Sequence, residues 1–472
     1  MLVARDDEKE LLRSALTDEY SQFIAVYGRR RVGKTFLVRE SFEYKFAFQH
    51  AGLANGGLAD QLYAFTDSLK EAGLTDFSAP KNWLEAFSLL KELIRNQGHG
   101  KKVIFIDELS WMDAPRGKLI TALESFWNGW ASARKDIVLI VCASATSWMM
   151  SKVVHNKGGL YNRLTKQIHL RPFTLGECER FLDAKGVQLN RHQILECYMI
   201  MGGVPFYWDF LRQGRSLPQN IDDIFFARDA PLAQEFGYLY ASLFKNPEPY
   251  LAIVGSLGRR KAGMTREEIL TSTPIADSGA LTRQLEELES CGFIRRYRAF
   301  GKKTRGSIYQ LVDNFTLFYY KFLANGRQDE HFWENSIDSG SRNAWCGLAF
   351  ERVCLEHVPQ IKRSLGIAGV LTDVSAWSCK ADPDEGIFGS QIDLLINRRD
   401  QIINLCEMKY SADDYTISKR VDESLRHKMS DFKRLTKTRS AIHLTIITPY
   451  GVQKNKYWSS IQSVVAADDL FA

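Results

Sequence analysis

Long hydrophobic runs are absent from this sequence of 472 residues. The longest apolar run, Ile137–Ala143, falls well short of the roughly 20 residues that a membrane-spanning helix needs. The opening stretch MLVARDDEKELL becomes charged almost at once, which argues against a secretory signal. We therefore expect a protein without a membrane partner, located in the cytoplasm.

Paired cysteines are also missing. The eight cysteines are scattered, with no C-x-x-C pair and no cluster of histidine and cysteine at metal-binding spacing. Cys142, Cys354 and Cys406 lie in apolar runs, as reduced core cysteines do. This usage excludes a disulfide framework and a cysteine-bound zinc site, and it agrees with a cytoplasmic location.

A strong charge bias is the third absence. The net charge of +6 comes from 62 basic and 56 acidic residues, which is weak evidence for a polyanionic partner. Hydrophobic residues make up 45% and charged residues 25%, an ordinary composition for a soluble globular protein. The length predicts about three domains.

A phosphate-binding motif stands near the start of the chain. Residues 28–35, GRRRVGKT, match G-x-x-x-x-G-K-[ST], between an apolar strand at 23–26 and a helical pattern from Lys34. Lys34 is expected to reach the β- and γ-phosphates, and Thr35 to offer its hydroxyl to Mg²⁺. The alternative is a chance glycine-rich turn. We expect ATP and Mg²⁺ as cofactors, with nucleotide contacts from Gly28, Arg29, Arg30, Arg31, Val32, Gly33, Lys34, Thr35 and Phe36.

Two acids follow the next buried strand. In KKVIFIDEL, Asp107 and Glu108 stand at the carboxyl end of residues 103–106, where ligands bind in open α/β sheets. We assign Asp107 to the magnesium ion and Glu108 to polarising the attacking water. The alternative is that these acids cap the following helix.

A serine and an arginine complete the predicted nucleotide site. The apolar strand 137–142 delivers Ser144 to the same sheet edge, where its hydroxyl is placed to sense the γ-phosphate; an ordinary loop serine is the alternative. Arg163, in GGLYNRL, is a candidate arginine finger acting in its own site or in a neighbour's. The alternative for Arg163 is a solvated side chain.

The motifs GRRRVGKT, IFIDELSWMD, VCASATSWM, LRPFTLGECERFL and GGVPFYWDF together resemble the archaeal-type ATPases of the STAND and AAA superfamily. The resemblance implies a P-loop NTPase parallel sheet in residues 1–171 and a helical lid in 172–245. The opening LVARDDEKELL is similar to a family box that lies against the nucleotide base, which implies that Val3, Arg5 and Glu8 lie near the adenine. Assembly of such ATPases implies a possible homo-oligomer.

Residues 246–325 predict a winged helix. Thr265 and Glu268 form a capping box, Gly292 closes the second helix, and two strands at 293–299 and 307–312 flank the tip FGKKTRG. An apolar stripe on the second helix is made by Leu281, Leu285 and Leu288.

The predicted wing is basic, and the predicted recognition helix is acidic. The basic residues are Arg295, Arg296, Arg298, Lys302, Lys303 and Arg305, and the acidic ones are Glu286, Glu287 and Glu289. The wing suits contacts with DNA phosphates, whereas the acidic helix disfavours base reading. DNA contact and a purely structural packing role both remain open.

The last third contains a glutamate and a lysine on one face of a strand. In INLCEMKYS, Glu407 and Lys409 alternate onto the same side. A hairpin turning near residues 397–401 places Asp393 opposite Glu407, or nearly so. Like charges directly opposite each other repel, and a divalent cation explains the second acid better than a structural ion pair does. Glu351 interrupts the apolar stripe of an upstream helix.

The order of these elements is the core layout of PD-(D/E)xK nucleases, a restriction-endonuclease-like α/β fold in residues 326–472. We expect Asp393, Glu407 and Glu351 to bind Mg²⁺ and Lys409 to orient water and offset phosphate charge. Gln391, two residues before Asp393, lies on the same face. GLAFE, QIDLLINRRDQIINLCEMKYS and the end of the chain resemble the nuclease-like domain that accompanies these ATPases.

These predictions combine into an ATP-binding and ATP-hydrolysing protein that acts on DNA, with a Mg²⁺-dependent deoxyribonuclease domain gated by the ATPase. One alternative is a STAND-type switch whose nuclease-like domain binds nucleic acid without cutting. Another is a DNA-binding regulator of transcription. The glutamate and lysine pair favours the nuclease, and the acidic recognition helix disfavours the regulator.

Overall fold

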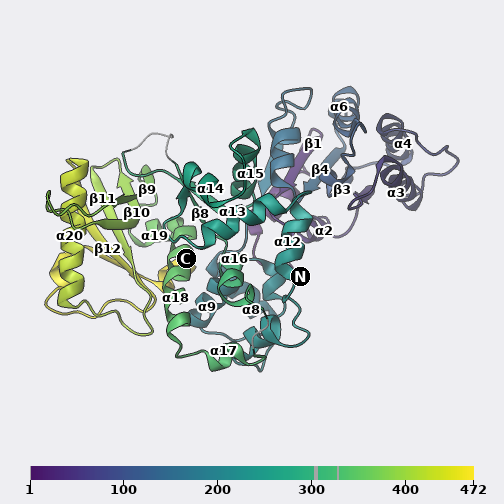
Figure 1. Cartoon of the computed structure of the whole chain (residues 1–472). Helices are drawn as coiled ribbons and strands as arrows, with labels where there is room; N and C mark the ends of the chain where they lie inside the picture. Colours follow the sequence, from purple (N-terminus) through teal and green to yellow (C-terminus); the bar gives the residue numbers. More distant parts are fainter. Residues whose placement is uncertain (1, 302–306, 327–328) are drawn as a thin grey trace. The chain divides into compact units, whose positions relative to one another are not determined.

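The computed structural model describes residues 2–301, 307–326 and 329–472. The chain divides into two compact units, residues 1–172 and residues 173–472 (Figure 1). The division falls one residue after the predicted end of the ATPase core. Within the described residues, no helix combines the length and the apolar content that crossing a membrane requires.

A parallel sheet forms the centre of the first unit. Its strands follow the order β2-β3-β4-β1-β5, and every pairing is parallel. The strands are β1 (Gln22–Tyr27), β2 (Phe48–Ala51), β3 (Lys102–Asp107), β4 (Ile137–Ala143) and β5 (Lys166–His169). All residues of β1, β3 and β4 are buried, which explains their uninterrupted apolar sequences.

Helices cover both faces of this sheet. Phe23 and Ala25 of β1 pack into the core that includes α3, α4 and α6, whereas Ile24 and Val26 pack into the core on α1 and α2. The helices are α1 (Asp6–Ser14), α2 (Lys34–Ser41), α3 (Leu58–Glu71), α4 (Trp83–Asn96), α5 (Leu109–Met112), α6 (Leu119–Gly129) and α7 (Thr146–Met149), with η2 (Met150–Val154) after α7. Because β1, β3 and β4 run parallel, their carboxyl ends lie at the same edge of the sheet.

The second unit begins with helices, as the sequence predicts for residues 172–245. These are α8 (Leu175–Lys185), α9 (Arg191–Met201), α10 (Pro205–Trp208), α11 (Leu217–Ile221), η3 (Asp222–Phe226) and α12 (Glu235–Leu243). Capping boxes start α8 at Thr174, α9 at Asn190 and α11 at Ser216. Each box satisfies free backbone amides at a helix start, so local sequence fixes these boundaries.

Residues 246–325, here called the middle segment, contain helices followed by a hairpin. The elements are α13 (Glu248–Gly258), β6 (Met264–Thr265), α14 (Arg266–Ser272), α15 (Gly279–Ser290), β7 (Ile294–Tyr297), β8 (Ile308–Leu311), α16 (Asn314–Phe318) and η4 (Tyr319–Leu323). Thr265 and Glu268 form the predicted capping box, and the sheet has the order β6-β8-β7. Both hairpin strands are shorter than the predicted strands 293–299 and 307–312.

Residues 326–472, here called the C-terminal segment, build a mixed sheet. Its order is β13-β12-β11-β10-β9; β9, β10 and β11 pair antiparallel, and β11, β12 and β13 pair parallel. The elements are α17 (Phe332–Asn335), α18 (Gly340–Glu356), α19 (Val358–Ser364), β9 (Thr372–Cys379), β10 (Ser390–Arg398), β11 (Ile402–Met408), α20 (Lys419–Thr436), β12 (Ala441–Thr448) and β13 (Ser463–Ala466). Leu425 and Phe432 of α20 pack on one face of this sheet.

Candidate functional site

The loop after β1 has the shape of a phosphate cradle. Gly28 has a φ of 149°, and a Cβ atom there would lie 2.1 Å from the carbonyl oxygen of Leu170. Gly33 has a φ of 90° and directly precedes α2. Lys34 is buried, and its Nζ donates to the carbonyls of Gly28 (2.9 Å) and Arg29 (3.0 Å). The side chain of Lys34 therefore lies inside the loop and bonds to the backbone of its first two residues.

The predicted magnesium ligands of this loop are in contact. Thr35 Oγ1 donates to Asp107 Oδ2 at 2.6 Å, and Asp107 Oδ1 accepts the backbone N–H of Glu108 at 2.9 Å. Thr35 is the second residue of α2, and Asp107 ends β3, so the sheet edge brings together residues that are 72 positions apart. A hydroxyl and a carboxylate in contact at the mouth of a phosphate loop are the ligand types that Mg²⁺ takes in such sites.

Ser144 joins the P-loop lysine to Glu108. Its Oγ accepts from Lys34 Nζ (3.0 Å) and donates to Glu108 Oε1 (2.6 Å), and its backbone N–H donates to Glu108 Oε2 (3.2 Å). Glu108 occupies the residue before α5 with a φ of 45°, but its side chain makes no capping bond. The helix-cap alternative therefore does not describe Glu108, whose carboxylate faces Ser144.

The other predicted nucleotide contacts are spread around the loop. Val32 is buried, Arg30 and Arg31 are half-buried, and Phe36 is exposed. Arg5 is buried at the start of α1, where it donates to the carbonyl of Arg171 and pairs with Glu8 at 3.6 Å. Val3 precedes it and is half-buried.

Arg163 lies on an exposed turn between η2 and β5. Its backbone N–H donates to the carbonyl of Leu160 at 3.1 Å. The structure therefore does not gather Arg163 with Lys34, Glu108 and Ser144. Its assignment as an arginine finger stays a prediction, and an exposed arginine agrees equally with the solvated alternative.

The hairpin of β10 and β11 has the predicted register. Leu394 pairs with Cys406, so the next position along places Asp393 against Glu407. Pairing between β9 and β10 shifts between Ile392 and Leu395, which marks a local irregularity beside Asp393. Asp393 Oδ1 accepts from Gln391 Nε2 at 2.6 Å. The glutamine that sequence placed near the acid is thus its direct partner.

Glu407 is held by two lysines. Lys409 Nζ lies 2.9 Å from Glu407 Oε1, and Lys428 Nζ contacts both carboxylate oxygens at 2.8 and 3.1 Å. Burial opposes the charged carboxylate, but the two lysines outweigh it and lower the pKa of Glu407. The same pairing raises the pKa of Lys409 against the effect of its own burial. Glu407 is therefore ionised and Lys409 charged near neutral pH.

Glu351 joins this cluster from α18. Burial and the nearby Asp393 raise its pKa, and Lys409 interacts electrostatically with the same carboxylate. Its Oε1 accepts from Lys261 Nζ at 2.6 Å, whereas its buried Oε2 has no hydrogen-bond partner. Glu351, Asp393, Glu407 and Lys409 thus lie in one electrostatic neighbourhood, built from α18, β10 and β11.

The three acids are near one another but are not gathered as a finished metal site. In the part of the chain that the structure describes, Asp222, His331 and Glu334 are the only three such residues with ligand atoms within 4.8 Å of one another. Asp222 there accepts two backbone amides at the start of α17, which is a capping role. The acids of the C-terminal sheet are turned instead to lysines and an amide.

Two site residues escaped the sequence analysis, Lys428 and Lys261. Lys428 belongs to α20, which the sequence shows only as a basic amphipathic segment, and helical phase alone does not tell which lysine faces β11. Lys261 lies 90 residues from Glu351. The one available signal was a buried glutamate that required a cation somewhere in the fold.

The predicted wing residues do not form a single exposed patch. Arg295 Nε donates to Gln310 Oε1 at 2.6 Å, and burial together with Arg352 lowers the pKa of Arg295 to about 10. Arg296 pairs with Glu289 at 3.5 Å. Lys302, Lys303 and Arg305 lie outside the described residues. Of the described wing arginines, Arg295 is half-buried, whereas Arg296 and Arg298 are exposed.

Comparisons with known proteins find one family match and one relative over most of the chain. The family described as an ATPase domain predominantly from Archaea matches residues 2–208. An uncharacterized protein of Methanocaldococcus jannaschii is 24% identical over 423 residues, covering 87% of this chain and 88% of that protein.

Two solved structures are similar at low identity. The Walker-type ATPase of Pyrococcus abyssi is 15% identical, covers 68% of this chain and 96% of that chain, and has a TM-score of 0.48. The ORC2 protein of Aeropyrum pernix is 14% identical, covers 71% and 96%, and has a TM-score of 0.41. From the family match and the geometry of its phosphate loop, residues 2–208 carry an archaeal-type, nucleotide-binding ATPase domain.

Proposed function

We propose that this chain is an ATP-hydrolysing protein that acts on DNA, with its ATPase gating metal-dependent cleavage by the C-terminal segment. The observation that carries the proposal is the convergence of Glu351, Asp393, Glu407 and Lys409 from separate elements of one mixed sheet and its helix. Buried carboxylates cost folding free energy, and a fold keeps several together when they hold a cation or perform chemistry. A purely structural ion pair requires only one of these acids.

A divalent cation suits the acids of the C-terminal sheet. The buried Oε2 of Glu351 lacks a partner, and Asp393 and Glu407 offer carboxylate oxygens from neighbouring strands. Glu351, Asp393 and Glu407 would hold Mg²⁺, and the ion would supply the positive charge that a phosphodiester needs during hydrolysis. Hard oxygen ligands alone favour Mg²⁺ or Mn²⁺ over zinc.

The protein's own residues have distinct roles in this proposal. Lys409 is charged and partly exposed, so its ammonium is available to a phosphate oxygen or to the attacking water. Lys428, more buried, fixes the Glu407 carboxylate in place. Gln391 orients Asp393 through their 2.6 Å hydrogen bond. These residues bind and orient the metal ion, the water and the phosphate.

In the ATPase domain, we propose that Thr35 and Asp107 bind Mg²⁺ and that Glu108 polarises the attacking water. Support comes from the contact of Thr35 with Asp107 and from the position of Glu108 beside Ser144. Lys34 already lies in the loop whose amides would surround the phosphates. Phosphate binding draws Lys34 toward the anion, which loosens its contact with Ser144.

DNA contact and the winged-helix assignment rest on the middle segment. We propose that residues 246–325 are a winged helix, because two helices precede a hairpin in a small sheet of order β6-β8-β7. Arg420, Arg426 and Lys433 of α20 are exposed and are candidates for further phosphate contacts. A homo-oligomer, expected of STAND-type ATPases, is part of this proposal.

The test is cleavage of supercoiled, linear and single-stranded DNA with Mg²⁺ or Mn²⁺, with and without ATP. We expect the wild type to cut and Lys409→Ala to lose at least about a hundredfold in rate, because an oriented ammonium beside a phosphate is worth several kcal/mol. Lys245→Ala, an exposed lysine in the same unit, is the matched control. Lys34→Ala reports whether ATP gates the cutting.

Wild-type protein that hydrolyses ATP and binds DNA, yet leaves every substrate intact, would contradict the nuclease. The second candidate is then favoured, a STAND-type switch or DNA-binding regulator whose C-terminal segment binds without cutting. One observation supports that candidate: the carboxylates are each occupied by a lysine or an amide and do not form a ready metal cage.

A further inference from the structure

The loop that follows α13 inserts a lysine into the acidic cluster of the C-terminal segment. Lys261 Nζ lies 2.6 Å from Oε1 of Glu351, whose side chain is only 10% exposed. The acid belongs to α18 of the C-terminal segment, and the lysine belongs to the middle segment. A buried carboxylate that the proposed function assigns to a metal ion is thus neutralised by a cation from another part of the same chain.

The backbone of Lys261 is anchored from two sides. Its carbonyl accepts from Arg352 Nη2 at 2.6 Å and from Gln310 Nε2 at 2.7 Å. Arg352 follows Glu351 on α18, and Gln310 lies on β8. The loop is therefore held against the acids by its main chain, while the lysine side chain, 51% exposed, keeps a path to solvent. The side chain alone is free to leave Glu351.

A second contact closes the edge of the C-terminal sheet. Ala299, just after β7, forms a parallel bridge with Ala376 of β9, and the N–H of Phe300 donates to the carbonyl of Ala376 at 2.8 Å. The ring of Phe300 packs on Phe432 with centroids 5.1 Å apart. Strand β9 is the edge of its sheet, and this contact covers part of that edge.

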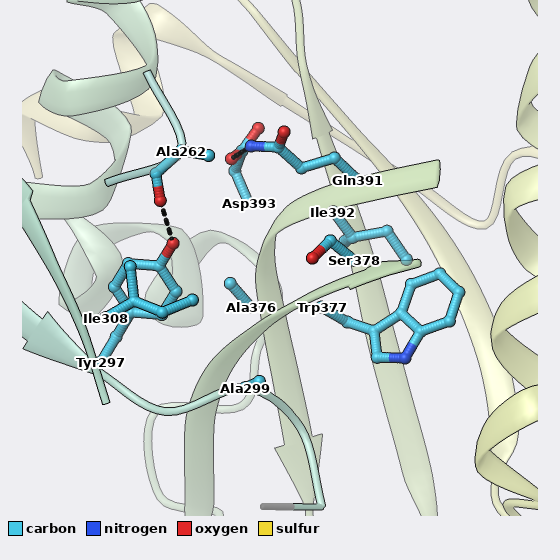
Figure 2. Close-up of a pocket in the computed structure, with 10 residues that line it drawn as sticks. All are labelled: Ala262, Tyr297, Ala299, Ile308, Ala376, Trp377, Ser378, Gln391, Ile392 and Asp393. Atoms are coloured by element: carbon cyan, nitrogen blue, oxygen red, sulfur yellow. Dashed lines mark hydrogen bonds between the residues drawn. The ribbon is translucent and has the colours of Figure 1, made fainter. Parts of the chain in front are cut away.

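The two contacts leave little room beside Asp393. A cavity of about 40 Å³ lies there, between Ala262, Tyr297 and Ile308 of the middle segment and residues of β9 and β10 (Figure 2). The Tyr297 hydroxyl donates to the carbonyl of Ala262 at 2.6 Å across its mouth. Sites for small ligands run from about 300 Å³ upward. The cavity admits water or an ion and excludes a nucleotide.

Charge also favours the packing of the middle segment against the acids of the C-terminal segment. Arg295 of β7 interacts electrostatically with Asp393, as does Arg352. The middle segment thus brings two cations, Lys261 and Arg295, to a site with a buried acid, Glu351, and a half-buried one, Asp393. Such complementarity stabilises docking in the absence of a metal ion and weakens when a divalent cation takes the same carboxylates.

We propose that the middle segment is an internal plug of the proposed nuclease site, with Lys261 standing in for the metal ion at Glu351. The inference rests on the proposed function for the identity of the site and adds its regulation. In the plugged state, the ammonium competes with the divalent cation, and the contact of residues 299–300 with Ala376 excludes the nucleic acid. Release of the plug frees Glu351 and opens the space at Asp393 together.

The first test compares Mn²⁺ affinity in Lys261→Gln and in wild type, by calorimetry on the full chain without DNA. We expect the C-terminal site to bind Mn²⁺ roughly tenfold more tightly in the variant, a usual size for one coupled charge. Arg260→Gln is the matched control, because Arg260 pairs with Glu268 at 3.0 Å, away from the acids. Removing the carboxylate of the ATPase metal site with Asp107→Asn in every form keeps its ion from the measurement.

The second test locks the plug. Ala299→Cys combined with Ala376→Cys places two thiols across the bridge, and oxidation joins them. We expect oxidised protein to lose at least about tenfold in DNA cleavage and reductant to restore it. Each single cysteine variant, oxidised in the same way, controls for the native cysteines. Equal cleavage by oxidised and reduced forms of the double variant would overturn the plug.

The outcomes separate this inference from the proposed function. If no form cuts DNA but Lys261→Gln binds Mn²⁺ more tightly than Arg260→Gln, the plug holds and the nuclease fails. If wild type cuts and Lys261→Gln matches Arg260→Gln in Mn²⁺ affinity, the nuclease holds and the competing role of Lys261 is wrong. Equal affinities without any cutting contradict both.

Discussion

Replacing Ser144 with alanine tests two contacts of its hydroxyl, one with Lys34 and one with Glu108. The three N–H groups of Lys34 are matched by three acceptors: Gly28 O at 2.9 Å, Arg29 O at 3.0 Å and Ser144 Oγ at 3.0 Å. Phosphate must draw the lysine away from acceptors that already satisfy it. Removing one acceptor destabilises the nucleotide-free state and leaves the ADP-bound state unaffected at that atom.

A hydrogen bond to a charged donor contributes about 1.5 to 3 kcal/mol, and relaxation of the loop recovers part of that. A net effect of about 1 kcal/mol corresponds to roughly fivefold in affinity. We therefore expect Ser144→Ala to bind ADP about fivefold more tightly than wild type does. The direction is the informative part, because loss of a direct ligand contact would weaken ADP binding.

The rate of ATP hydrolysis, in contrast to the affinity for ADP, should fall in Ser144→Ala. Ser144 also fixes Glu108, through Oγ to Oε1 at 2.6 Å and through its backbone N–H to Oε2 at 3.2 Å. Alanine keeps the second bond and loses the first, so Glu108 loses its fixed orientation. We expect kcat for ATP to fall at least about tenfold, within the range that general base catalysis supplies.

The assays are calorimetric titration with ADP and steady-state phosphate release from ATP. Ser151→Ala is the control, because Ser151 is exposed in the same unit and its hydroxyl donates only to the carbonyl of Trp148. An unchanged or weakened ADP affinity in Ser144→Ala would refute the role given to the Lys34 contact. An unchanged kcat would refute the role given to the Glu108 contact.

Two further perturbations test the fold around the same site. Gly28→Ala should destabilise the first unit by at least about 3 kcal/mol in urea unfolding, because its Cβ would lie 2.1 Å from Leu170 O. A Cβ at Gly33 meets nothing within 4 Å, so Gly33→Ala should cost only about 1 to 2 kcal/mol of backbone strain. Equal losses of stability in the two variants would contradict this. Burial lowers the pKa of His50 to about 4, so its contribution is fully present above about pH 6.5 and is lost as the pH falls toward 4, by up to about 3 kcal/mol. The fall in urea midpoint between pH 7 and pH 4.5 should be smaller in His50→Gln, and an equal fall would exclude this histidine as its cause.

The contacts around the phosphate loop were predictable because their geometry is local. Gly28, Lys34 and Thr35 lie in one loop, and Asp107 ends a strand whose unbroken apolar sequence marks it as central. Parallel strands share one carboxyl edge, so placing the strands places the acid. The same reasoning gave the hairpin register, since a turn centred near residue 400 leaves Asp393 opposite Glu407.

The partners of the buried acids were not predictable in this way. Lys428 meets Glu407 only because α20 packs on the sheet with Leu425 and Phe432 inward, and the basic helix contains several lysines in similar surroundings. Lys261 meets Glu351 through the docking of one segment on another, which no local pattern encodes. The short strands β2 and β13 were not predicted, because four residues are too few to show the alternation of apolar and polar side chains that marks a strand.

The exposure of the three lysines decides which of them a metal ion or a phosphate displaces. Lys428 is 19% exposed and contacts both oxygens of Glu407, so moving it breaks two bonds in a covered site. Lys409 and Lys261 are 41% and 51% exposed and contact one oxygen each, so water replaces their bonds as they leave. A carboxylate neutralised only by fixed charge is structural, whereas one neutralised by a removable charge can exchange it for a ligand. Glu351, whose ion pair is with the exposed Lys261 side chain, is therefore the acid at which a metal ion would displace a cation of the middle segment.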